Sequence, residues 1–176
     1  MIKKLFFILV VVFFSTSFLI PEKVVKKADK VIGKFYEIKD FSKEVIIIPY
    51  EVNSRTPIEF GNENLFKIII KDKLLGYGYI GNAQSRTATF DYLVLFDKDF
   101  IIIKTKVLIY REDYGGEIGS KRWLSQFTGK SSISPELEYN KNIIPISGAT
   151  ISVRSMTRAM NDVLRSIGEL QKLNLL

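Results

Sequence analysis

The sequence predicts an α+β domain, in which an antiparallel sheet of about four or more strands packs with a C-terminal amphipathic helix, behind an N-terminal signal or anchor. Three observations predict this class. Strand-like runs separated by short charged turns fill residues 65–110, and apolar residues recur at helical spacing over residues 150–170. A mostly apolar segment, residues 5–20, precedes both. The chain has 176 residues, 47% of them hydrophobic, which is enough for one domain with its own core.

The N-terminus, residues 1–20, has the pattern of a secretory signal peptide. Lys3 and Lys4 precede an unbroken apolar run, and small residues follow at 15–17, where a peptidase could cut. The alternative is an uncleaved membrane anchor, although residues 5–20 fall just short of the roughly 20 that span a bilayer. A lipid-modified cysteine is excluded, since the chain has no Cys. Either way we expect the rest of the chain outside the cytoplasm, in the periplasm or at the outer face of the cytoplasmic membrane.

Residues 21–64 form an N-terminal segment with a helix and a strand. Apolar residues at three- and four-residue steps predict a helix over residues 22–35. The apolar run 45–48 predicts a short buried strand that Pro49 ends. Residues 53–64 are polar and contain Pro and Gly, so they are expected to form a loop.

An antiparallel meander is predicted next. Its strands are expected at residues 65–70, 74–81, 87–96 and 100–110, with charged turns at 71–73 and 97–99. In the last of these strands one face should carry Ile103, Thr105, Val107 and Ile109, and the other Lys104 and Lys106. Tyr77 and Tyr79 should share a face of their strand, in the core or at an edge.

The remainder of the chain, to residue 176, completes the domain that begins at residue 65. We expect a loop at 111–119, a short helix at 120–127 and irregular structure at 129–144. The final helix, 150–170, has a clear apolar stripe, formed by Val153, Met156, Met160, Val163, Ile167 and Leu170.

Composition excludes several kinds of chemistry. Without Cys there is no disulfide, thiolate metal site, iron–sulfur cluster or thiol nucleophile, and without His there is no Ser-His-Asp triad or imidazole base. We therefore predict no metal site, and redox work would require a bound organic cofactor. The net charge is +7, with a local cluster at Lys23, Lys26, Lys27 and Lys30 that suggests a solvated helix face near an anionic membrane. Nucleic acid fits the sign of the charge but not the compartment, so we predict no nucleic-acid partner.

The turn Ser147-Gly148-Ala149-Thr150 is a candidate phosphate site. It lies where an apolar stretch meets the final helix, and a helix N-terminus offers free N–H groups and a positive dipole end. The alternative is an ordinary helix cap with Gly148 as a turn residue. The segment 112–117 is either a ligand loop or a surface turn, and Trp123 is either a site residue or a core residue.

Taken together, these segments resemble the FMN-binding domain family, which includes the extracytoplasmic flavin subunits of the sodium-pumping quinone reductase and the related Rnf complex, and the flavin domains of NosR-type proteins. The resemblance covers residues 65–172. Three matches carry it in the family's order: Gly76-Tyr77-Gly78-Tyr79; then Arg111-Glu112-Asp113-Tyr114-Gly115-Gly116 leading into Trp123-Leu124-Ser125-Gln126-Phe127-Thr128-Gly129-Lys130; and Ser147-Gly148-Ala149-Thr150-Ile151-Ser152 with the helix that follows.

The resemblance implies a set of site residues. Thr150 would form a phosphoester with the FMN phosphate, and the backbone of the turn with Ser147, Gly148 and Ala149 would cradle that phosphate. The flavin ring would be bordered by Glu112, Gly115, Gly116, Trp123, Leu124 and Gln126. A separate magnesium-dependent flavin transferase makes the attachment in the family. Many members carry Asp three residues before the Ser, where this chain has Ile144, so covalent FMN, noncovalent FMN and no flavin all stay open.

The function that the resemblance implies is that of an exported electron-transfer flavoprotein. It would pass electrons between membrane-associated redox partners, as a carrier or subunit more than as a stand-alone enzyme. Two alternatives remain: a flavin-free binding or scaffold module of an envelope complex, and a redox sensor.

Overall fold

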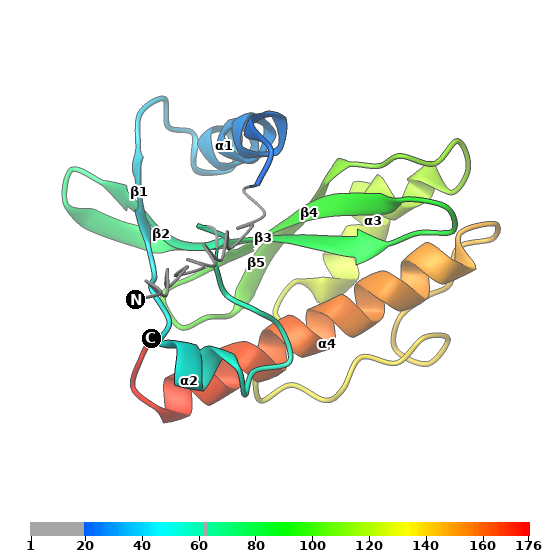
Figure 1. The fold of residues 1–176 in the computed structure, drawn as a ribbon. Coiled ribbons are helices and arrows are strands. Elements are labelled where there is room, and N and C mark those ends of the chain that lie inside the picture. Colours follow the sequence, from blue (N-terminus) through cyan, green and yellow to red (C-terminus); the bar gives the residue numbers. More distant parts are fainter. Residues whose placement is uncertain (1–19, 62) are drawn as a thin grey trace, which may run out of the picture.

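The computed structural model describes residues 20–61 and 63–176. It has three layers, with a central sheet covered by helix α1 (Glu22–Tyr36) on one face and by helix α4 (Thr150–Lys172) on the other (Figure 1). The predicted signal or anchor segment lies outside the described residues, apart from its last residue. None of the helices described here is long and apolar enough to cross a membrane.

The sheet confirms the predicted meander and adds one strand at its edge. Five antiparallel strands pair in chain order. They are β1 (Ser42–Val45), β2 (Leu65–Ile70), β3 (Lys73–Gln84), β4 (Thr89–Phe96) and β5 (Ile102–Ile109). Because neighbours in sequence are neighbours in the sheet, short turns suffice for the connections from β2 onward.

The first strand is displaced from its predicted position. The structure pairs Ser42–Val45 with β2, whereas residues 46–48 run on toward Pro49 and the short helix α2 (Tyr50–Asn53). Ile48 is buried in the core, but Ile47 is 87% exposed. The prediction of a buried strand at 45–48 was therefore wrong, because β2 begins at Leu65 and offers residues 47 and 48 no partner.

Strand β5 also departs from the simple alternation that its sequence suggests. The register with β4 shifts at two points, between Asp91 and Tyr92 and between Leu95 and Phe96. Each shift inserts one extra residue into β5, as β-bulges do. Val107 consequently packs on the α4 side of the sheet, whereas Ile103 and Ile109 pack on the α1 side. The prediction that these three residues share one face of the strand was therefore wrong.

The two faces of the sheet bury separate clusters. The cluster under α1 contains Val24, Ala28 and Ile32 together with Phe66, Ile68, Leu93 and Leu95. The larger cluster under α4 contains the whole predicted stripe of that helix, each member with no measurable exposure. Tyr77 and Tyr79 share the α4 face as expected, where Tyr77 stacks on Phe100 with ring centroids 4.0 Å apart.

Three short helical segments follow β5 and complete the domain. They are η1 (Gly116–Gly119), α3 (Lys121–Leu124) and η2 (Ser125–Phe127). Irregular backbone over the following residues then leads to α4, as the sequence predicts.

Truncation inside the α4 stripe should destabilise the whole domain. Met160→Ala removes a fully buried side chain, and such changes cost about 2–5 kcal/mol because of lost transfer energy and the cavity left behind. Urea unfolding should show this loss. The matched control is Arg158→Ala, an exposed site on the same helix, where a change within about 0.5 kcal/mol is expected. Equal effects at the two positions would contradict the packing described here.

Candidate functional site

A cleft opens at the N-terminal end of α4. The turn between β3 and β4 and the segment that follows β5 lie near this helix end (Figure 1) and line the cleft with it. The volume of the cleft is about 550 Å³. The cleft is lined by Arg86, Thr87, Tyr110, Glu112, Asp113, Tyr114, Gly148, Ala149, Thr150, Ile151 and Ser152. The structure therefore brings the turn that contains Thr150 together with the loop that contains Glu112, as the sequence analysis expects.

The start of α4 is built to leave its amide groups available. Gly148 has a φ of +76°, a left-handed conformation that glycine adopts without strain. Ala149 occupies the N-cap position, and within the described residues no side chain caps this helix end. Its first N–H groups and the positive end of the helix dipole therefore remain free for an anion. Thr150, the first residue of the helix, is exposed beside them.

The glycine loop before η1 packs directly on this turn. Gly115 has a φ of +76°, and a Cβ atom at that position would lie 2.7 Å from the Cβ of Ala149. A larger residue at position 115 would therefore push the loop away from the turn. Gly116 begins η1 in open surroundings, with no atom within 4 Å of where its Cβ would be.

Glu112 acts as a clamp on the β3–β4 turn. Its Oε1 accepts hydrogen bonds from Ser85 Oγ at 2.7 Å, Thr87 N at 2.6 Å and Ala88 N at 3.1 Å. Its Oε2 accepts one from Thr87 Oγ1 at 2.9 Å. These hydrogen bonds lower the pKa of Glu112 to about 2, and the bond from Ser85 has the largest effect. Because both carboxylate oxygens are engaged, the side chain fixes one wall of the cleft.

A second tie joins β5 to the first turn of α4. The hydroxyls of Tyr110 and Ser152 lie 3.1 Å apart and share a hydrogen bond. Tyr110 and Ser152 were not singled out from the sequence as site residues, and neither were Arg86 and Thr87. Only their places in the sequence could have indicated a site. Tyr110 lies at the end of a predicted strand, Ser152 in the first turn of the final helix, and Arg86 and Thr87 between two predicted strands.

Trp123 and Gln126 lie behind the cleft, where they hold the chain that enters the turn. Trp123 Nε1 donates to the carbonyl of Ile144 at 2.8 Å, and the N–H of Ile144 donates to Gln126 Oε1 at 2.7 Å. Leu124 is buried in the core beneath α4. The backbone of Ile144 is thus held from both sides, while its side chain stays 66% exposed. These side chains position the turn, and they do not line the cleft.

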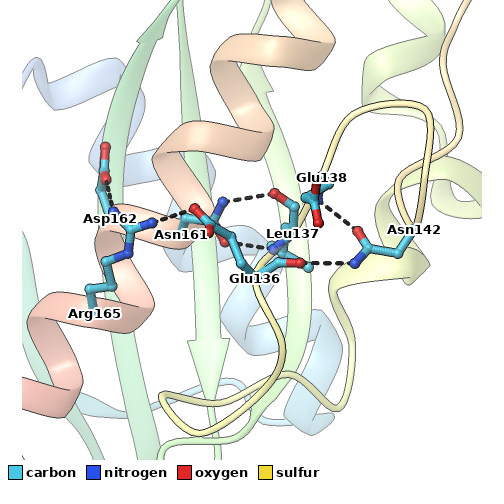
Figure 2. Close-up of polar contacts among 7 residues, drawn as sticks. All are labelled: Glu136, Leu137, Glu138, Asn142, Asn161, Asp162 and Arg165. Atoms are coloured by element: carbon cyan, nitrogen blue, oxygen red, sulfur yellow. Dashed lines mark hydrogen bonds and ion pairs between the residues drawn. The ribbon is translucent and has the colours of Figure 1, made fainter.

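The loop that precedes Ile144 is tied to α4 as well. Figure 2 shows Asn161 of α4 bound twice to Leu137, accepting from its N–H and donating to its carbonyl, each at 2.9 Å. Arg165, one turn further along, pairs with Glu136 and approaches Asp162. Asn142 closes the loop through the backbone of Glu136 and Glu138. The loop is therefore fastened to the same helix whose N-terminus forms the site.

The donor set of the cleft suits an anionic ligand. Arg86 lines the same cleft as the first residues of α4, whose N–H groups are free. Across residues 20–61 and 63–176, no group of three or more acidic side chains is placed to hold a metal ion.

Comparison with protein-family models matches residues 87–165 to the FMN-binding domain. The matched segment makes up a little under half of the chain. The match points to FMN as the cofactor, and the resemblance drawn from the sequence motifs is confirmed. The match contains the Glu112 loop, the Trp123 segment and the turn at Thr150.

Among solved structures, the crystal structure of Shewanella oneidensis NqrC is similar to 55% of this chain, with 22% sequence identity and a TM-score of 0.44. The similarity spans 52% of the NqrC chain, about half of its length. A search of curated proteins found no match.

The clamp formed by Glu112 predicts a specific pH dependence. A carboxyl whose pKa is about 2 when folded and about 4.3 when unfolded stabilises the fold above pH 4.3, and this contribution is lost as pH falls through the folded value. Glu112→Gln should therefore lower the unfolding temperature at pH 7, and the difference from wild type should shrink toward pH 2. Thermal unfolding across this range measures it.

The control for this prediction is Glu117→Gln, at an exposed glutamate two residues beyond Gly115. We expect its difference from wild type to be small at every pH. A Glu112→Gln difference that stayed constant from pH 7 to acid would count against the clamp.

Proposed function

We propose that this protein is an exported electron-transfer flavoprotein, with FMN attached through a phosphoester to Thr150. The observation that carries the proposal is that Thr150 is exposed at the uncapped N-terminus of α4 and lines a cleft, within the segment that matches the FMN-binding domain. Phosphate held by the helix amides would lie beside this hydroxyl.

The residues of the cleft have distinct parts in this proposal. The N–H groups at the start of α4 would bind the phosphate, and Gly148 would let it approach the backbone closely. Glu112 and the Tyr110–Ser152 hydrogen bond would keep the two walls apart at a fixed width. Tyr114 and Ile151, exposed at the rim, offer apolar surface to a planar ring. Bound FMN would supply reversible electron uptake, which no side chain of this chain provides.

A carrier role fits the side chains better than turnover chemistry does. The chain has no His or Cys, and the carboxylate of Glu112 is occupied by hydrogen bonds to the β3–β4 turn. Redox proteins at a membrane are the expected electron donor and acceptor. The signal-like N-terminus supports export, either as a cleaved leader or as an anchor.

A separate flavin transferase is proposed to make the bond.

A second candidate, a flavin-free scaffold module, is favoured by one observation: the exposed side chain at position 144 is Ile where many family members have Asp. Since Trp123 and Gln126 hold only the backbone there, the change alters what a transferase would meet without altering the turn.

Loss of the acceptor hydroxyl should abolish covalent flavin. In Thr150→Val, coexpressed with a flavin transferase, the denatured protein should show no flavin fluorescence on a gel, and intact mass should lack the addition of one FMN less one water. Thr128→Val, an exposed threonine of the same domain, should keep both signals. Flavin retained in Thr150→Val after denaturation would disprove the attachment site. A colourless wild-type protein would favour the flavin-free module.

Restoring an acidic side chain at position 144 should raise the flavinylated fraction. Ile144→Asp changes an exposed side chain, so the fold should tolerate it. Intact-mass measurement after limited coexpression with the transferase gives the fraction directly. The matched control is Ile133→Asp, because Ile133 is 93% exposed and lies in the preceding loop. An equal fraction in Ile144→Asp and wild type would show that this position does not limit attachment.

A further inference from the structure

Helix α1 carries a stripe of lysines along one flank. Lys23, Lys27, Lys30 and Lys34 follow one another at steps of four, three and four residues, so their side chains lie above one another on the helix. The acidic residues of the helix lie on a different flank. There Glu22 pairs with Lys26, and Asp29 pairs with Lys43 at the edge of the sheet.

The stripe continues onto the sheet and α3. Lys27 Nζ donates to the carbonyl of Leu108 in β5 at 3.0 Å, and Lys104 Nζ lies 6.0 Å from the ring centroid of Phe35. Partial burial, and then the charges of Lys121, Lys106 and Lys34, lower the pKa of Lys104. We call the joint surface the lysine surface, formed by Lys23, Lys27, Lys30, Lys34, Lys104, Lys106 and Lys121.

The charges of the lysine surface are not balanced locally. In the described part of the chain, every salt bridge of the α1 region involves Lys26, Lys43 or Lys67, and none involves a lysine of this surface. An ordinary solvated surface mixes both signs, whereas here three elements bring one sign together. Such an arrangement repels itself and is relieved by a partner with many negative charges.

We propose that the lysine surface docks on an anionic lipid bilayer. Charge is the first argument, because lysines near an anionic leaflet each gain binding energy. The second is the course of the chain. The mostly apolar segment 5–20 directly precedes α1 in the sequence, and Ile20 packs against the core cluster under that helix. Insertion of this segment in a bilayer would therefore bring α1 to the interface. An acidic protein is the competing occupant.

The cofactor cleft would remain open in this orientation. Helices α1 and α4 cover opposite faces of the sheet (Figure 1). The lysine surface is formed by α1, β5 and the start of α3, whereas the cleft is lined by the start of α4, the turn between β3 and β4 and the segment after β5. The two share no residue. The inference therefore does not depend on flavin, and variants of the lysine surface should leave flavin loading unchanged.

Lysine footprinting tests the proposal on the full chain. The protein is placed in nanodiscs of zwitterionic lipid alone, or of zwitterionic lipid mixed with anionic phosphatidylglycerol, and is briefly acetylated at low extent. Mass spectrometry then gives the modification rate of each lysine. In the anionic discs we expect Lys30, Lys34 and Lys106 to react at least about threefold more slowly, and high salt should remove this protection. Lys141 and Lys172, remote from the lysine surface, serve as internal references.

A matched pair of variants isolates the charge. The triple change Lys30→Gln, Lys34→Gln and Lys106→Gln should abolish protection of Lys23 and Lys27, whereas Lys39→Gln, Lys141→Gln and Lys172→Gln should preserve it. The salt dependence of the wild type decides the question if the first variant does not fold. Equal rates in the two lipids, protection that ignores salt, or protection that appears only when an acidic protein is added would each overturn the proposal.

Discussion

The packing of α4 against the sheet decides where the cleft lies. Its stripe from Val153 to Leu170 is buried along its whole length, and each such side chain contributes about 1.5–3 kcal/mol relative to exposure. The helix cannot slide along the sheet without losing that burial. Its first turn is therefore held beyond the apolar stripe, at the end of the sheet, with Thr150 exposed. A site made of backbone N–H groups needs this rigidity, because a helix that frays at its start loses the alignment of those donors.

The other motifs hold this turn and the opposite wall of the cleft in place. Trp123 and Gln126 hold the two backbone groups of Ile144, and Gly115 permits contact with Ala149. Glu112 sets the opposite wall through the β3–β4 turn. The sequence analysis assigned these residues to the border of the flavin ring. In the structure Glu112 lines the cleft, and Trp123 and Gln126 hold the backbone that leads into the turn. A buried hydrogen bond to a main-chain group fixes a loop without occupying the space that a ligand needs.

Sequence periodicity predicted the elements that depend on a repeated pattern. The α4 stripe and strand β2 lie at the expected residues, because burial on one face imposes its period on the sequence. The predicted position of strand β1 was wrong because a short apolar run does not determine which of its residues pair with another strand. The residues that pair with β1 are more than 20 positions away in the sequence. The two bulges of β5 were invisible for the same reason, since they arise from register against β4. The clamp of Glu112 on Thr87 joins residues 25 apart, which no local pattern reveals.

The separation of the two charged regions follows from the layered fold. A meander has two faces, and each must be covered by a helix because both carry apolar side chains. One covering helix, α4, presents its N-terminus at the end of the sheet, where an uncapped turn favours an anionic group. The other, α1, covers the opposite face with a flank of lysines that continues onto β5. Because the sheet lies between them, an anion at the start of α4 would be kept apart from the lysines of α1. Positive charge is therefore concentrated at two separate places in this domain. At the cleft it comes from the backbone dipoles at the start of α4, and on the α1 face it comes from the ammonium groups of lysine side chains.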